Sequence, residues 1–262
     1  MSKLDIPVYL INLDRSPLRL ASAQSQLNKY KIEFERIRAV DGQGLEAADF
    51  EEYNDFNAKK YYGRSMTSGE IGCYFSHVKA LNTFLKSNER HCIILEDDFH
   101  ATASGWEIVC EIIELSLHGH LGLWDIGNLT KPPRFLFKPI VEIATENTSS
   151  TLCKAYYFPT VATANVWNRK GAENFLAHYN NPIGPVDHII RKYVSKNGSG
   201  IALSAPAFAH PKGESDIRSA SPLWQKPAKI GHYRCREIVR QSSCIVSAAF
   251  NFANHSNTNT VS

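Results

Sequence analysis

The apolar positions of the chain fall into short continuous runs and longer stretches with helical spacing. Residues 8–11 form an apolar run with no polar side, which predicts a strand buried on both faces in the middle of a sheet. The polar residues 12–15 end the run. Ser16 and Pro17 suit the cap and first turn of a helix, so we expect a helix over about residues 17–30.

The same patterns predict the elements that follow. Thr67 and Glu70 have the spacing of a capping box, and apolar residues then recur with helical period to about residue 85. Further strands are expected at residues 34–42, 91–96, 123–127, 155–167 and 201–210, and further helices at 168–179 and 185–197. Residues 43–64 show no regular pattern, and the last nine or so residues are polar and expected to be disordered.

This order of strands and helices predicts an α/β protein with an open sheet flanked by helices. We divide the chain of 262 residues into one domain over residues 1–225 and a basic C-terminal segment with a tail over 226–262. The net charge of +3 is too small to argue for a nucleic-acid partner. Residues 226–240 are rich in Lys and Arg, which favours either contact with a phosphate-rich or anionic membrane surface or a solvated basic face.

The six cysteines contain no C-x-x-C pair, so the sequence signals neither a zinc site nor a disulfide framework. No charged leader with an apolar stretch opens the sequence, and no apolar run approaches the length of a membrane span. We therefore expect a cytoplasmic protein.

Three adjacent carboxylates, Glu96, Asp97 and Asp98, follow the apolar run at residues 92–95. They repel one another unless a cation or hydrogen-bond donors offset the charge, which favours a hard divalent ion, Mn²⁺ or Mg²⁺. A solvated acidic turn is the alternative. His210 ends an expected strand and is either a further metal ligand or an ordinary turn histidine.

A metal next to the arginines of the first loop suits a pyrophosphate, and this pairing predicts sugar transfer from a nucleotide donor. The acceptor hydroxyl must lose a proton to a base. Asp187 lies in the first turn of an expected helix, where the dipole keeps a carboxylate ionised, so it is either that base or a carboxylate that only stabilises the helix. His77, within an apolar helix pattern, has a structural role as its default interpretation.

Six ordered motifs resemble glycosyltransferase family 25, the bacterial lipooligosaccharide galactosyltransferase group that is similar to animal collagen galactosyltransferases. They are VYLINLDRSPLR, IRAVDG, GEIGCYFSHVKAL, IILEDD, NRKGAENFL and PVDHII, within about residues 5–215. The resemblance implies a GT-A-like, Rossmann-like mixed sheet, inversion at the anomeric carbon, UDP-galactose as donor and a Mn²⁺ or Mg²⁺ ion.

The resemblance also implies roles for individual residues. Glu96, Asp97 and Asp98 correspond to the DxD motif, with Glu96 and Asp98 on the metal and Asp97 near the donor. Asp187 and His188 match a later Asp-His pair of the family. The remaining residues placed at or near the donor are Asn12, Leu13, Arg15, Arg19, Asp41, Glu70, Ser76 and His77.

We therefore expect a metal-dependent transferase that moves galactose from UDP-galactose to a sugar hydroxyl of lipooligosaccharide, with residues 226–240 on the anionic inner membrane. Two alternatives remain. A metal-dependent phosphohydrolase or nucleotidyltransferase would use the same carboxylates but would need a second acidic cluster. A non-catalytic nucleotide-sugar binding module would bind the donor without turnover.

Overall fold

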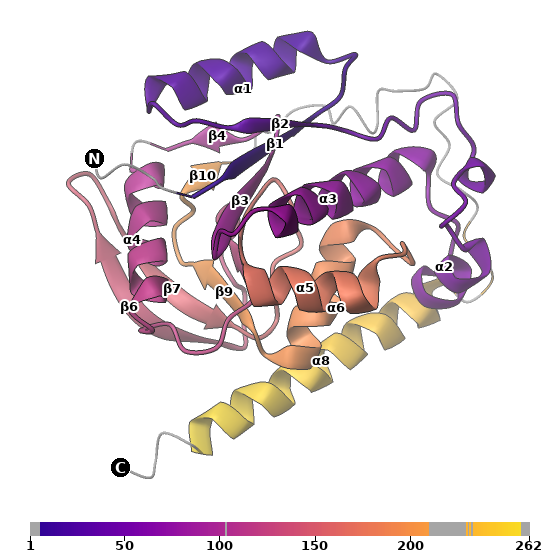
Figure 1. Cartoon of the computed structure of the whole chain (residues 1–262). Helices are drawn as coiled ribbons and strands as arrows, with labels where there is room; N and C mark the ends of the chain where they lie inside the picture. The colour runs from indigo at the N-terminus through magenta and orange to yellow at the C-terminus, as the bar shows by residue number, and fades with distance from the viewer. Residues whose placement is uncertain (1–5, 103, 210–228, 230, 232, 258–262) are drawn as a thin grey trace.

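Figure 1 shows the computed structural model of the chain, in which residues 6–102, 104–209, 229, 231 and 233–257 are described. One mixed sheet of eight strands forms the centre, in the order β2-β1-β3-β8-β5-β9-β7-β6. Its strands are β1 (Val8–Asn12), β2 (Glu35–Arg38), β3 (His91–Glu96), β5 (Ile126–Asn128), β6 (Phe137–Ala144), β7 (Ser149–Ala155), β8 (Ala164–Asn168) and β9 (Gly200–Leu203). A second, two-stranded sheet pairs β4 (His100–Ala101) with β10 (Phe208–Ala209).

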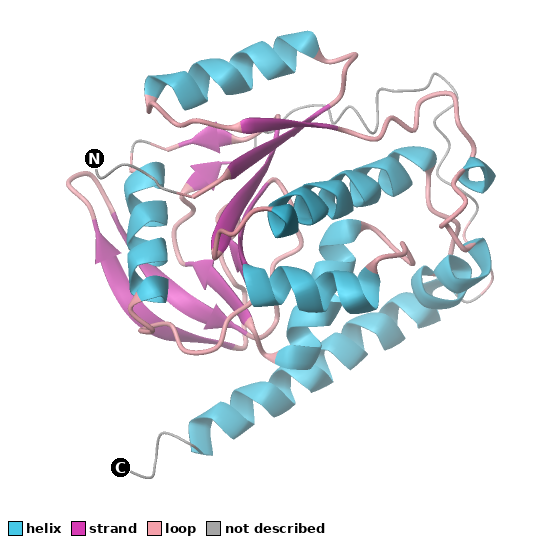
Figure 2. Ribbon diagram, in the orientation of Figure 1, coloured by secondary structure: helices cyan, strands magenta, loops and turns pink. Residues whose placement is uncertain are grey.

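Helices cover both faces of the sheet, as Figure 2 shows. They are α1 (Pro17–Lys29), α2 (Asp55–Tyr62), α3 (Ser68–Lys86), α4 (Gly105–Leu117), α5 (Arg169–Tyr179), α6 (Val186–Asn197) and α8 (Tyr233–Asn257), with a short 3-10 turn η1 (Ala47–Asp49). Strand β1 lies between β2 and β3 and is buried throughout. Val8 and Leu10 pack with α1 and α4, whereas Tyr9 and Ile11 pack with α3, α5 and α6. Because successive side chains of β1 point to opposite faces of the sheet, the core is divided into two layers.

The predicted fold class, an α/β open mixed sheet flanked by helices, is confirmed. The local signals that predicted helices also have the expected structure. The side chain of Thr67 accepts a hydrogen bond from Glu70 N at 3.1 Å, and the carboxylate of Glu70 accepts one from Thr67 N at 2.9 Å. Asn168 caps α5 by accepting from Gly171 N at 2.7 Å.

Four local predictions differ from the structure. The strand expected at residues 155–167 is present only at Ala155, the end of β7, and from Ala164, the start of β8. Residues 43–64, expected to lack regular structure, contain η1 and α2. The expected strand at residues 201–210 divides into β9 and β10, which belong to different sheets and flank Pro206. The tail, expected to be disordered over its last nine or so residues, is helical through Asn257, and residues 258–262 lie outside the described residues.

Helix α8 packs against α6 and α2, and its Cys244 and Ala248 are buried against Tyr156 and Tyr157. The proposed domain division at residue 226 lies outside the described residues. Among the helices that the structure describes, none is long and apolar enough to cross a membrane.

Candidate active site

The carboxyl ends of β1 and β3 lie side by side and bring the first polar loop to the acidic triplet. Ile11 is paired with Glu96 in the parallel register, so Asn12 and Asp97 follow at the same edge. Asn12 Nδ2 donates a hydrogen bond of 2.6 Å to Asp97 Oδ2, and both residues are buried. Asn12 also donates to the carbonyl of Ser16 at 3.2 Å, which fixes the start of α1.

Arg19, from the first turn of α1, supplies positive charge to two of the three carboxylates. One terminal nitrogen of its guanidinium lies 2.5 Å from Asp97 Oδ1 and 3.2 Å from Asp98 Oδ2. Arg19 therefore offsets repulsion within the triplet. The sequence predicts Arg19 at the nucleotide, and in the structure Arg19 contacts the acidic residues of the same edge.

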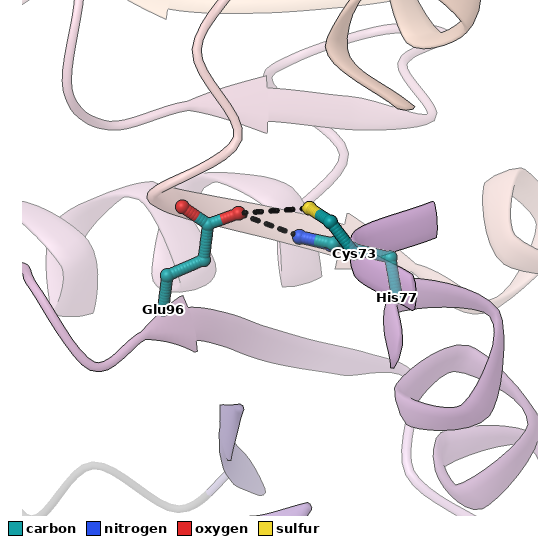
Figure 3. A group of neighbouring side chains, drawn as sticks. All are labelled: Cys73, His77 and Glu96. Carbon is teal, nitrogen blue, oxygen red and sulfur yellow. Dashed lines mark hydrogen bonds and ion pairs between the residues drawn. The ribbon is translucent and has the colours of Figure 1, made fainter. Parts of the chain in front are cut away.

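Glu96 faces the opposite way, toward α3 (Figure 3). Its Oε1 lies 3.0 Å from Nε2 of His77 and accepts a hydrogen bond of 3.7 Å from Sγ of Cys73. Its other oxygen accepts from Thr163 Oγ1 at 3.4 Å. The triplet thus contacts two helices, Glu96 contacting α3 and both Asp97 and Asp98 contacting α1.

Asp187 reaches the same edge from the first turn of α6. Burial raises the pKa of the Cys73 thiol, and the negative charges of Glu96, Asp187 and Asp98 raise it further. Glu96 contacts this thiol directly at 3.7 Å, and Asp187 and Asp98 are near enough for their charges to act on it. Asp187 Oδ1 accepts a hydrogen bond of 2.8 Å from His188 N, at the positive end of the helix dipole.

Two basic side chains, Lys131 and Arg191, are near enough to Asp187 for its charge to act on them. Lys131 follows β5, and Arg191 lies one turn after Asp187 on α6. Burial lowers the pKa of both side chains, while the charge of Asp187 opposes this effect. Arg191 Nε donates to the carbonyl of Phe158 at 2.6 Å, which fixes its guanidinium. Asp187 thus has the basic side chains of Lys131 and Arg191 near it, in addition to the thiol of Cys73.

Other predicted donor residues have partners within the protein. Arg15 Nε donates to Asp41 Oδ2 at 2.8 Å, so these two residues form an ion pair with each other. Leu13 is half-buried, and its carbonyl accepts from Ser16 N at 3.0 Å. All three lie near the ends of β1 and β2, as expected for residues of one loop cluster.

Within α3, Glu70 and Ser76 make contacts that maintain the fold. The carboxylate of Glu70 accepts two hydrogen bonds from the buried guanidinium of Arg64, at 2.6 and 2.8 Å, in addition to its part in the capping box. Ser76 Oγ accepts from Val40 N at 2.9 Å and so attaches the loop before Asp41 to the helix.

Of two further histidines named from the sequence, the structure describes His188 but not His210. His188 lies edge-on to the ring of Tyr62, with ring centroids 5.6 Å apart, and burial lowers its pKa. His210, the proposed third metal ligand, lies outside the described residues.

A cavity of about 460 Å³ lies at the other edge of the sheet. Asp125, Asn168 and Tyr193 are among its lining residues. Asn168 pairs with His91 at the start of β3, whereas the triplet follows the end of that strand. This cavity is therefore separate from the candidate active site.

A family model for "Glycosyltransferase family 25 (LPS biosynthesis protein)" matches residues 5–190. The chain belongs to glycosyltransferase family 25. A glycosyltransferase 25 family member of Drosophila melanogaster is 34% identical over 106 residues, which are 37% of this chain and 17% of that protein. Procollagen galactosyltransferase 1 of Danio rerio is 32% identical over 99 residues, 35% of this chain and 16% of that protein.

Other relatives broaden the comparison. The probable inactive glycosyltransferase 25 family member 3 of Rattus norvegicus is 26% identical over 163 residues, 59% of this chain and 27% of that protein. A glycosyltransferase 25 family member of Aedes aegypti is matched over only 20% of its length, so this chain spans about a fifth of it. A solved structure of the galactosyltransferase LgtC with donor and acceptor sugar analogues has a TM-score of 0.40 and 12% identity, with 90% of this chain and 96% of that chain covered.

The structure adds residues to this family 25 site that the sequence analysis did not select. Cys73, Thr163, Lys131 and Arg191 all contact or influence the carboxylates that it did select. Two of them had a signal in the sequence, because Cys73 and His77, and likewise Asp187 and Arg191, are four residues apart on expected helices and so share a face. Lys131 and Thr163 come near these carboxylates only through the tertiary fold.

The residues at this edge have the kind of side chains that bind a divalent ion. Glu96 and Asp98 provide carboxylate oxygens, the ligands that Mn²⁺ and Mg²⁺ prefer. Neither carboxylate is isolated, since Glu96 lies against His77 and Asp98 against Arg19. An ion bound here would therefore share these groups with existing partners.

Proposed function

We propose that this family 25 protein is an inverting, metal-dependent transferase that moves galactose from UDP-galactose to a sugar hydroxyl of lipooligosaccharide. The observation that carries the proposal is the acidic triplet at the end of β3, where Asp97 and Asp98 contact Arg19 of the first helix and Glu96 contacts His77. Family membership and the galactosyltransferase names of relatives support the reaction class.

The chain's residues divide the work of such a reaction. Glu96 and Asp98 would hold Mn²⁺ or Mg²⁺, which supplies positive charge for the leaving diphosphate. Lys131 and Arg191, whose pKa values respond to the charge of Asp187, add positive charge near it. Asp187 would accept the proton of the acceptor hydroxyl from the first turn of α6, where the helix dipole favours a negative charge.

A transfer assay tests the proposal. The full chain is incubated with UDP-galactose, Mn²⁺ and a lipooligosaccharide acceptor, and UDP release and the mass of the product are measured. Asp187→Asn should lower kcat by about 10²- to 10⁴-fold, the usual contribution of a general base. Glu173→Gln, which changes an exposed carboxylate on α5, should leave kcat unchanged.

The other outcomes of this assay identify the alternatives. Release of inorganic phosphate or nucleoside monophosphate without a sugar product would identify a phosphohydrolase or nucleotidyltransferase. Binding of UDP-galactose with no turnover would identify a binding module, an outcome consistent with the relatives named as inactive.

We also propose that the protein acts in the cytoplasm, on the anionic inner membrane where a lipid-linked acceptor lies. Support comes from the outer face of α8, where Ile238, Val239, Val246 and Phe250 are 63–68% exposed. An apolar helix face with nearby basic residues suits the interface of an anionic bilayer. Exposed Arg234 lies at the start of this face.

The structure corrects one part of that prediction. Arg240, within the basic segment, is buried and its guanidinium lies 4.3 Å from the ring centroid of Tyr62. It therefore serves packing, and the membrane contact depends on the residues around it. Val239→Asp with Val246→Asp should abolish flotation with phosphatidylglycerol vesicles, whereas the exposed control Ser243→Asp should float normally. Equal flotation of the two variants would refute the membrane contact.

A further inference from the structure

Three side chains of different chemistry meet where α3 faces the end of β3. Sγ of Cys73, Nε2 of His77 and a carboxylate oxygen of Glu96 all lie within 4.8 Å of one another (Figure 3). Cys73 and His77 are four residues apart, so they lie on the same face of the helix, one turn from each other. Glu96 points at both from the neighbouring strand end.

The distances approach those of a tetrahedral metal site. Zn²⁺ binds sulfur at about 2.3 Å and nitrogen or oxygen at about 2.0–2.1 Å, so neighbouring ligands lie about 3.3 Å apart for N and O and about 3.6 Å for S and O. Nε2 of His77 is 3.0 Å from Oε1 of Glu96, and Sγ of Cys73 is 3.7 Å from the same oxygen. Small side-chain rotations are enough to convert this arrangement into a coordination shell.

The donor set selects the class of ion. A thiolate, an imidazole and a carboxylate suit Zn²⁺ or a similar borderline ion, whereas Mg²⁺ prefers oxygen ligands alone. Three protein ligands with a fourth position open are typical of zinc sites that bind a further molecule. His77 is 3% exposed and Glu96 is 24% exposed, so the site is closed on the helix side and open beside Glu96.

The helix that carries two of the ligands is firmly held. Its N-terminus has a complete capping box, and the hydroxyl of the buried Tyr74 donates to the carbonyl of Tyr179 at 2.6 Å. A metal site needs ligands that are positioned before the ion arrives. The backbone of α3 provides this order for Cys73 and His77.

We infer that Cys73, His77 and Glu96 form a binding site for a borderline divalent cation of the zinc class. The site shares Glu96 with the Mn²⁺ or Mg²⁺ position proposed above but has different other ligands. An ion of the zinc class therefore competes with the hard ion for Glu96. The inference does not depend on the proposed transfer reaction, because the ion binds without a sugar nucleotide.

Titration of the full, reduced chain with Co²⁺ tests this site, because cobalt is a spectroscopic substitute for zinc. The expected result is a thiolate-to-cobalt charge-transfer band in the near ultraviolet that saturates at one equivalent and disappears when Zn²⁺ is added. Cys73→Ser should abolish the band. Cys235→Ser, which changes an exposed cysteine on α8, should retain it.

Two further variants separate this site from the hard-ion position and from a folding defect. Asp98→Asn should keep the band, because Asp98 is not a ligand of this site. His77→Gln should weaken cobalt binding at least tenfold, and the circular dichroism spectra of all variants are compared with that of the unaltered chain. Absence of the band in the unaltered chain, or its persistence in a folded Cys73→Ser variant, would overturn the inference, whether or not UDP binds.

Discussion

Asp97→Asn tests whether the central carboxylate of the triplet holds the site together. Its oxygens contact Asn12 Nδ2 at 2.6 Å and a guanidinium nitrogen of Arg19 at 2.5 Å. These contacts join the end of β3 to the loop after β1 and to the first turn of α1. The substitution keeps the shape of the side chain but removes its charge.

The structure sets the size of the effect. Removing one partner of a buried ion pair costs about 3–5 kcal/mol, because the other charge loses its compensation. The Asp97 side chain is 8% exposed, but Arg19 is 27% exposed and retains Asp98 at 3.2 Å. Screening by water and the remaining carboxylate reduce the cost to about 2 kcal/mol. For a protein of this size, that lowers Tm by about 4–8 °C.

Thermal and urea unfolding followed by circular dichroism measure the change. Asp14→Asn is the matched control, because Asp14 also forms ion pairs with two arginines, Arg36 at 2.8 Å and Arg38, but is exposed to solvent. We expect a clear loss of stability for Asp97→Asn and little change for Asp14→Asn. Equal Tm values for the two variants would refute the structural role of Asp97.

Three further substitutions have defined outcomes. Glu70→Gln should lower the free energy of unfolding by about 1–3 kcal/mol, because buried Arg64 loses its charged partner; an unchanged urea midpoint would contradict this. Burial lowers the pKa of His91 from 6.5 to about 4, so the unfolded chain binds the proton more readily. The contribution of neutral His91 to the free energy of unfolding is therefore complete above about pH 6.5 and is lost as the pH falls through about 4. His91→Gln should remove this part of the acid sensitivity, measured by urea unfolding at several pH values. The same acid sensitivity in both proteins would refute the assignment. Gly72→Ala would place a Cβ 2.4 Å from the carbonyl oxygen of Val40, so we expect a loss of about 1–3 kcal/mol, measured by urea unfolding; a stabilised variant would show that α3 has room there.

The parts of the fold that the sequence predicted are those determined by local signals. The apolar run of β1, the capping box of α3 and the Asn168 cap of α5 each act within a few residues. Helix α2 was missed although it has local signals, since Asn54 caps its start and Gly63 ends it in a left-handed conformation. Its apolar pattern is weak because it packs against α8, near the other end of the chain, and sequence order does not indicate that partner.

The site shows the same limit. The sequence identified Glu96 and Asp98 as chemical groups and placed Asp187 at the start of a helix. It could not show that Glu96 turns toward His77 while Asp98 turns toward Arg19, because these partners come from separate helices on opposite faces of the sheet. The direction of a side chain at a strand end depends on tertiary contacts, which adjacency in sequence does not encode.

The most direct test of the central claim, that the edge at the end of β3 binds a nucleotide sugar with a metal ion, is calorimetric titration of UDP into the full chain. The account predicts binding heat with Mn²⁺ that is lost in EDTA and in Asp98→Asn but kept in the exposed control Asp14→Asn. The same heat in EDTA and in Asp98→Asn would show that UDP binds without these carboxylates. No heat under any of these conditions would contradict a UDP site altogether.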